Sequence, residues 1–218
     1  MVSWAALRTL ALDEADAGWF GTLAPVVVER ARRSRLGRRL LSRRLAAHGA
    51  PVLFGTLPRS TPQSIAVSTW AAWPSLRLRE IACDLGAIAL APALRAVVRR
   101  EAVLRVRAVL GEPRYALALA SAGHVDGGSD REHRVLAKSL ASDAALATAV
   151  RRLGFSEFLA FARAVHPACA ERLLIGEAPG SIAETRLAWL DGARVATYLA
   201  ALPAANEGSV HDGASSDH

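Results

Sequence analysis

The sequence predicts an all-α fold, a compact orthogonal bundle of many helices, and three observations favour it. The 218 residues are 52% hydrophobic but only 6% aromatic, so most apolar residues are alanine, leucine and valine, and alanine and leucine favour helices. Apolar residues recur at intervals of three and four through most of the chain, which is the period of a helix and not of a strand. Glycines and prolines divide these periodic segments into pieces of helical length.

The central segment, residues 74–121, shows the pattern most clearly and is predicted to form three consecutive helices. Pro92 lacks a backbone N–H, so it ends the first helix and suits the first turn of the second. Gly111 and Pro113 end the second helix, and a short third helix follows. The side chains expected to face inward are Leu78, Ile81, Ala82, Leu85, Ile88 or Ala89, Leu94, Val97, Val98, Val103, Val106 and Leu110.

The amino-terminal segment is predicted to begin with a helix capped by Ser3. The apolar side chains of this helix point inward, and its acidic side chains, Asp13, Glu14 and Asp16, point outward. Trp19 and Phe20 are expected to close the core. A long irregular connection, with one helical turn near Ile65, then leads to two further core anchors, Trp70 and Trp73.

The carboxy-terminal segment is predicted to contain several short helices. Gly154 separates one helix at residues 144–153 from another at residues 155–165, and Pro167 begins a third. A capping box, Ser181 and Glu184, begins a last helix at residues 182–202. The inward face expected for this last helix consists of Ile182, Trp189, Ala193, Ala196 and Ala200.

The periodic segments are interpreted as one all-helical domain, residues 1–203. A glycine- and aspartate-rich loop between them leaves open a division into two lobes, residues 1–122 and 131–203. Residues 204–218 contain too few apolar side chains to offset the entropy of ordering them, so we expect a disordered tail.

Basic charge is concentrated in residues 26–47, within a chain whose formal net charge is +7. The basic residues of this segment are all arginine, and a stripe of leucines (Leu36, Leu40, Leu41 and Leu45) makes the segment an amphipathic helix. Gly37 is predicted to mark a turn within it. Two interpretations stay open: a solvated surface that reflects a general arginine bias, or a basic patch that binds a partner.

No residue pattern predicts a catalytic, cofactor-binding or metal site. The sequence has no phosphate-binding loop, metalloprotease motif, nucleophile elbow or Cys-x-x-Cys pair. Cys83 and Cys169 are expected to be free thiols, and His166 with Cys169 supplies too few ligands for zinc. An enzymatic alternative would have to use the loop between His124 and His133, where carboxylates lie near both imidazoles.

Two features argue against secretion and membrane insertion. Acidic residues occupy the positions where a signal peptide needs its apolar core. The longest apolar run, residues 81–98, is interrupted by Asp84, Pro92 and Arg95, whereas a membrane span needs about 20 largely uncharged residues. The sequence therefore predicts a cytoplasmic protein.

The order of features from Arg38 to Ser121 resembles the SctK family of type III secretion proteins (YscK, PscK and the Hrp equivalents). A basic stretch, RRLLSRRLAAHGAP, precedes an irregular linker and then LRLREIACDLGAIALAPALRAVVRREAVLRVRAVLGEPRYALALA. The positions that match the family layout are Leu85 and Gly86, Arg95, Arg99 and Arg100, and Leu110, Gly111 and Glu112.

The resemblance implies an all-helical, non-enzymatic accessory of the sorting platform, with no cofactor and no small-molecule substrate. Such an adaptor would link the cytoplasmic domain of an SctD-like inner-membrane ring protein to an SctQ-like pod protein, at the cytoplasmic face of the inner membrane. The arginines expected to form the partner surface are Arg32, Arg35, Arg39, Arg43, Arg95 and Arg99. The alternative is an arginine-rich helical module that binds nucleic acid or an anionic membrane surface. Sequence-specific reading of nucleic acid is not favoured, because residues 26–47 contain no Asn or Gln to read bases.

Overall fold

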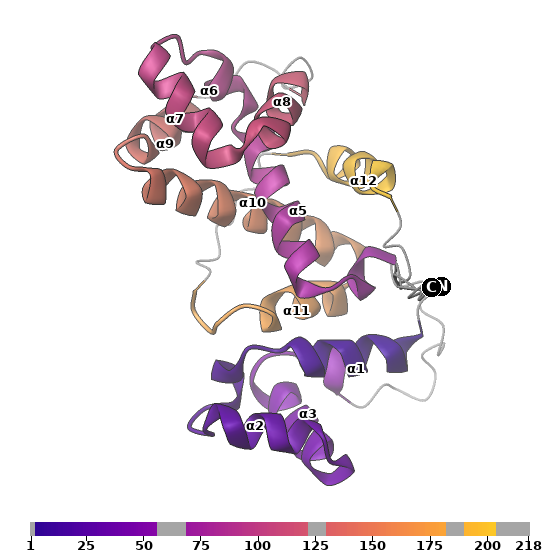
Figure 1. The fold of residues 1–218 in the computed structure, drawn as a ribbon. Helices are drawn as coiled ribbons and strands as arrows, with labels where there is room; N and C mark the ends of the chain where they lie inside the picture. The colour runs from indigo at the N-terminus through magenta and orange to yellow at the C-terminus, as the bar shows by residue number, and fades with distance from the viewer. Residues whose placement is uncertain (1–2, 56–68, 122–129, 182–189, 204–218) are drawn as a thin grey trace, which may run out of the picture.

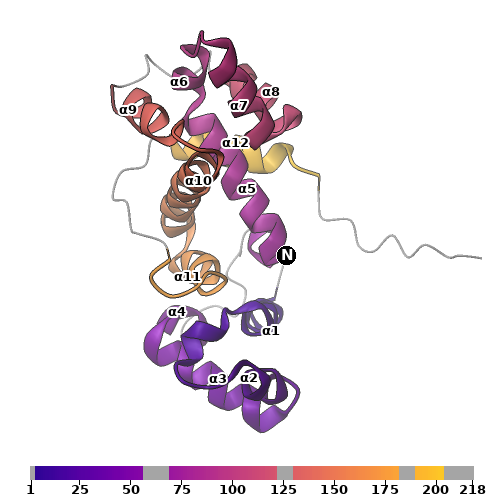
Figure 2. The same cartoon turned by 60° about the vertical axis from the view of Figure 1, so that its left-hand side comes forward.

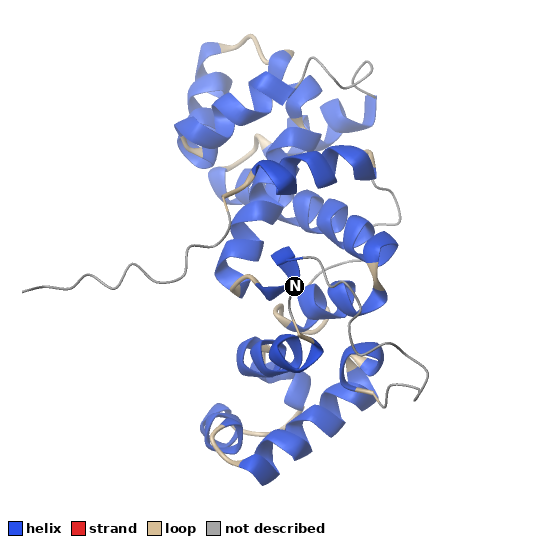
Figure 3. Ribbon diagram, turned by 90° about the vertical axis from the view of Figure 1, so that its right-hand side faces the viewer, coloured by secondary structure: helices blue, strands red, loops and turns tan. Residues whose placement is uncertain are grey.

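Helices are the regular elements of the computed structural model, which describes residues 3–55, 69–121, 130–181 and 190–203. No strand occurs in these ranges (Figure 1; Figure 3). The predicted all-α bundle is therefore confirmed. The expected loop at residues 122–129, the turn near Ile65, the capping box at residues 181–184 and the tail at residues 204–218 fall wholly or partly outside the described residues.

The elements follow one another in the order of their labels. Two short 3₁₀ helices, Ala17–Phe20 and Thr69–Ala72, lie among the α-helices. The bounds of the α-helices are α1 Trp4–Glu14, α2 Pro25–Arg32, α3 Arg35–His48, α4 Pro51–Phe54, α5 Ser75–Ala89, α6 Ala91–Arg95, α7 Arg100–Leu110, α8 Glu112–Ser121, α9 Asp130–Ser139, α10 Asp143–Val165, α11 Pro167–Ile175 and α12 Gly192–Ala201.

The helices stack in three levels (Figure 1; Figure 2). Helices α5 and α10 cross in the middle level, and their contact is the most extensive of any helix pair in the described ranges. Helices α6 to α9 cover one end of this pair. At the other end α11 contacts α4 and α1, and α2 and α3 form the outermost level.

The buried side chains form two clusters, and α5 and α10 contribute to both. The larger cluster joins α1–α5 to the carboxy-terminal part of α10, α11 and α12. The smaller one joins α6–α9 to Ala87 at the end of α5 and to Leu146 and Val150 on α10. Each cluster contains residues from both sides of positions 122–129, so neither cluster coincides with one of the two lobes considered from the sequence.

Two glycines allow α5 and α10 to cross in backbone contact. A Cβ atom on Gly154 would lie 1.6 Å from the carbonyl oxygen of Ala82, and one on Gly86 would lie 2.0 Å from the carbonyl oxygen of Val150. The predicted break at Gly154 is wrong, since α10 runs without interruption from Asp143 to Val165. Gly154 therefore allows the backbone of α5 to approach α10 closely, and it does not form a turn.

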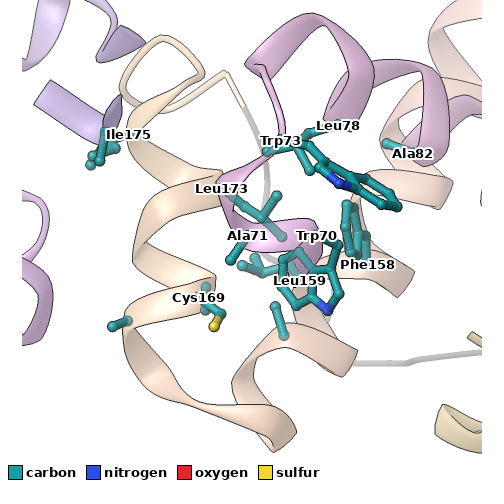
Figure 4. Close-up of a cluster of buried hydrophobic side chains, with 14 of the residues drawn as sticks. Trp70, Ala71, Trp73, Leu78, Ala82, Phe158, Leu159, Cys169, Leu173 and Ile175 are labelled. Carbon is teal, nitrogen blue, oxygen red and sulfur yellow. The ribbon is translucent and has the colours of Figure 1, made fainter. Parts of the chain in front are cut away.

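The aromatic anchors predicted between α4 and α5 lie in the larger cluster (Figure 4). Trp70 and Trp73 are both buried, and the ring centroid of Trp70 lies 4.9 Å from that of Phe158 on α10. Phe20 is also fully buried, and the indole N–H of Trp19 donates to the carbonyl oxygen of Glu177 over 2.8 Å. These predicted anchors are confirmed.

The central segment contains four helices, not the three predicted. The second predicted helix is divided into α6, which ends at Arg95, and α7, which begins at Arg100. The intervening turn lets Leu94 on α6 and Val106 on α7 face the same smaller cluster. Val98, expected to face inward, lies in this turn and is 88% exposed.

Two predicted helix faces also differ. The face of α12 that was expected to point inward contains Ala193, Ala196 and Ala200, but these residues are exposed. The helix buries Val195 and Leu199 instead, because larger side chains remove more apolar surface from water.

Helix α1 is capped by Ser3 as predicted, because the Ser3 hydroxyl accepts a hydrogen bond from the N–H of Ala6. Glu14, however, does not point into solvent as predicted. It accepts a hydrogen bond from the buried guanidinium of Arg172.

Candidate docking groove on α2 and α3

The basic segment forms a helical hairpin. Pro25 begins α2, and Ser34 caps α3 by accepting a hydrogen bond from the N–H of Gly37 over 3.0 Å. A Cβ on Gly37 would lie 2.3 Å from the carbonyl oxygen of Ala31, so this glycine brings the two helices together. The predicted turn at Gly37 is therefore wrong: the chain turns at residues 33–34.

The leucine stripe of α3 divides between the core and the surface. Leu41 and Leu45 are fully buried. Leu36 and Leu40, which belong to the same predicted stripe, are 79% and 58% exposed. The apolar stripe is wider than the face of α3 that the rest of the fold covers, because only Leu41 and Leu45 belong to the buried cluster.

The exposed leucines line an open groove of about 670 Å³ along α2 and α3. Val27 of α2 faces them across the groove, and Arg30, Arg39 and Arg43 contribute to its walls. Val26, which precedes Val27 on α2, is 69% exposed. The hairpin therefore presents apolar side chains and guanidinium groups on one surface.

No carboxylate lines this groove among the described residues. Arg30, Arg35, Arg39 and Arg43 are exposed, and none of them makes a hydrogen bond or ion pair with another described residue. Arg35 begins α3 next to Leu36, just outside the groove lining. The groove consequently has a positive electrostatic potential, which attracts anionic groups.

Arg32 is placed differently from the other predicted partner residues. Its guanidinium donates to the carbonyl oxygens of Leu12 and Ala15 and forms an ion pair with Glu29. Only 13% of its side chain is exposed. Arg32 therefore fixes α2 against α1 and does not present its charge to a partner.

The remaining predicted arginines are Arg95, which ends α6, and Arg99, which precedes α7. These two helices lie at the opposite end of the molecule from α2 and α3 (Figure 1). Arg95 donates to the carbonyl oxygen of Leu119 over 2.7 Å. Arg99 lines a second open hollow of about 660 Å³ between α7 and α9. Unlike the first groove, this hollow contains an acidic residue, Glu101. The structure thus separates the six predicted arginines and does not bring them into one surface.

The described residues do not bring the histidines named in the enzymatic alternative into one site. His124 lies outside them, and His133 is exposed on α9. His166 caps α11, its Nδ1 accepting from the N–H of Ala168 over 3.1 Å. The described residues contain no cluster of three His, Cys, Asp or Glu side chains suited to a metal.

The cysteines of the described ranges are free thiols, as predicted. Cys169 is buried, and burial raises the pKa of the half-buried Cys83 thiol above its usual range. A raised pKa disfavours the thiolate form of Cys83 and so works against nucleophilic activation of this residue.

No described helix combines the length and the apolar character needed to cross a bilayer.

The sequence indicates the arginines of the α2–α3 groove, but it does not indicate that Val27, Leu36 and Leu40 are exposed there. Comparison of the chain with protein-family models, with curated proteins and with solved structures found no match.

Proposed function

We propose that this chain is a non-enzymatic adaptor of a bacterial type III secretion system. It links the cytoplasmic domain of an SctD-like ring protein to an SctQ-like pod protein, at the cytoplasmic face of the inner membrane. The observation that carries a docking role is the α2–α3 groove, where exposed apolar side chains lie among arginines that have no partner in the described part of the chain. The specific secretion role is supported by the sequence resemblance at residues 38–121.

A docking role suits the chemistry of this surface better than catalysis does. Protein interfaces combine apolar centres with arginine, a residue enriched among the positions that contribute most to binding. A catalytic site instead needs an acid, base or nucleophile aimed at a reacting atom. The groove lining contains no histidine, cysteine or carboxylate among the described residues.

An adaptor must contact two partners without the contacts overlapping. The α2–α3 groove and the hollow between α7 and α9 lie at opposite ends of the molecule (Figure 2). Two proteins could therefore be held at once. This separation supports a linking role over that of a module with one ligand.

The test is an affinity pull-down of the tagged full chain from a secreting bacterium that carries the gene, after mild crosslinking. The expected result is recovery of the ring and pod proteins, identified by mass spectrometry, and of neither from a secretion-deficient deletion strain. Neighbouring genes for a secretion ATPase, its stator and a ring lipoprotein are expected as well. Recovery of neither the ring nor the pod protein would contradict the proposal.

A second candidate function is binding of nucleic acid or an anionic membrane surface, favoured by Arg30, Arg35, Arg39 and Arg43, which are exposed and have no partner among the described residues. Affinity of that kind falls steeply with salt because counterions are released on binding. The charge-reversed variant Arg39→Glu with Arg43→Glu would abolish it. Under the adaptor proposal, the chain shows no such salt-dependent binding to DNA or vesicles at physiological ionic strength.

A further inference from the structure

We infer that the α2–α3 groove binds an acidic amphipathic helix of a partner protein. Apolar side chains of that helix contact Val27, Leu36 and Leu40, and its flanking carboxylates pair with Arg30, Arg39 and Arg43. This inference specifies the partner chemistry of the docking role proposed above and rests on that role.

The apolar part of the surface is unusual for an exposed helical hairpin. Leu36 and Val26 are among the most exposed large apolar side chains of the described residues, and Leu40 is more than half exposed. Single exposed apolar residues are common on proteins, but Leu36 and Leu40 line the same groove as Val27. A partner that covered them would remove this apolar surface from water.

The charged side chains of this surface determine which charge the partner must carry. Arg30, Arg39 and Arg43 line the groove, and its lining contains no carboxylate in the part of the chain that the structure describes. Guanidinium groups bind carboxylates through two parallel hydrogen bonds, so arginine favours glutamate and aspartate partners with a defined geometry. The partner should therefore carry carboxylates on both sides of an apolar stripe.

The shape of the surface favours a helix as the bound element. Leu36 and Leu40 are four residues apart and lie on one side of α3, opposite Val27 of α2. A groove between two helices accepts a third helix, whose anchors repeat at intervals of three and four residues. The open volume of about 670 Å³ accommodates several side chains of such a helix.

Other occupants fit less well. A second copy paired by two-fold symmetry would place arginines opposite arginines, which repel each other. Residues 25–48 contain no Trp or Phe, so an anionic membrane would contact only leucine and valine on the apolar side of the hairpin. A nucleic acid bound through its phosphates would pair with the arginines but would not cover apolar side chains, so Leu36 and Leu40 would stay in water.

The test measures binding of the full chain to a fluorescein-labelled peptide by fluorescence anisotropy at physiological ionic strength. The peptide has five helical turns, leucines at intervals of three and four, and flanking glutamates. A scrambled peptide of identical composition is the reference. The amphipathic peptide is expected to bind at least about tenfold more tightly than the scrambled one.

Paired substitutions locate the binding to the groove. Leu36→Glu with Leu40→Glu, and separately Arg39→Glu with Arg43→Glu, are each expected to weaken peptide binding by at least about tenfold. The control at the other end of the molecule, Leu104→Glu with Lys138→Glu, lies outside both open surfaces and is expected to leave peptide binding unchanged. All these side chains are exposed, so circular dichroism and thermal unfolding should confirm that every variant folds.

Equal affinity for the two peptides, or equal weakening by the control variant, would overturn the inference. It would also be overturned if phosphatidylserine-rich vesicles or a short DNA duplex bound more tightly than the peptide and depended on the same residues. Pull-downs separate this result from the secretion role. If the wild-type chain and the Leu36→Glu, Leu40→Glu variant recover ring and pod proteins equally, the groove inference fails and the adaptor stands. If the peptide binds as expected but neither protein is recovered, the secretion role fails and the groove inference stands.

Discussion

Arg172 connects three segments that are far apart in the sequence. It is the largest fully buried side chain of the described residues, and it donates to Glu14 on α1 and to the hydroxyl of Ser75 on α5. Glu14 also accepts from the N–H and the hydroxyl of Ser75 over 2.9 and 2.8 Å. Burial lowers the pKa of the Arg172 guanidinium, and the charge of Glu14 opposes that shift.

The role of Glu14 could not be predicted from the sequence. It lies beside Asp13 and near Asp16, and nothing local distinguishes it from these exposed neighbours. Its partner is 158 positions away. Periodicity describes one element at a time, so a polar contact between remote elements leaves no signal in it.

The buried pair predicts an asymmetric response to substitution. Glu14→Ala should lower the free energy of unfolding by about 3–5 kcal/mol, because it leaves the buried guanidinium of Arg172 without its carboxylate. Arg172→Met should cost less, about 1–2 kcal/mol, since Glu14 keeps both donors of Ser75 and some contact with water. Urea unfolding followed by circular dichroism measures both values. A larger loss for Arg172→Met than for Glu14→Ala would show that the pair is not organised in this way.

The crossing of α5 and α10 shows why a glycine in a helical pattern has two possible interpretations, a helix end or a close contact between helices. Gly111 ends α7 with a positive φ of 76°, as its predicted role requires. Gly154 occurs in an equally periodic apolar context, yet it lies in the middle of α10. The sequence alone shows that a side chain is missing, but only the tertiary arrangement shows whether another backbone occupies the space.

The α5–α10 contact predicts a severe effect of the smallest possible substitution. Gly154→Ala should destabilise the protein by about 3 kcal/mol, because the new methyl group would force apart two backbones. The matched control is Gly192→Ala on α12, where the nearest atom to a new Cβ would be 3.9 Å away. We expect the control to stay within about 1 kcal/mol of the wild type. Thermal and urea unfolding compare the two, and equal stabilities would contradict the close crossing.

Helix α3 shows how much of the candidate groove the sequence could predict. The exposed arginines at positions 35, 39 and 43 follow directly from the amphipathic pattern. The exposed leucines do not, because a leucine stripe normally indicates a buried face. Whether Leu36 and Leu40 are covered depends on how much of α3 the neighbouring elements reach, and that is a property of the whole fold.

At the scale of the whole molecule, α5 and α10 hold the two hydrophobic clusters together. Ile81 and Phe158 belong to the larger cluster, whereas Ala87 and Val150 on the same two helices belong to the smaller one. The helical content could be predicted because it depends on local periodicity. The sharing of helices between clusters could not be predicted, because α5 and α10 are separated by more than 50 residues of sequence, and periodicity carries no signal of contacts between remote elements.

This arrangement predicts that neither lobe considered from the sequence folds alone. A fragment of residues 1–122 would expose the face of α5 that α10 covers, and a fragment of residues 131–203 would expose the facing side of α10. Each fragment should therefore lack the cooperative unfolding transition that a domain with its own core shows. When the two fragments are mixed, α5 and α10 can pair again, so helical circular dichroism should exceed the sum of the separate spectra. A cooperative transition in either isolated fragment would mean that the α5–α10 crossing joins two independent domains and is not the shared centre of one.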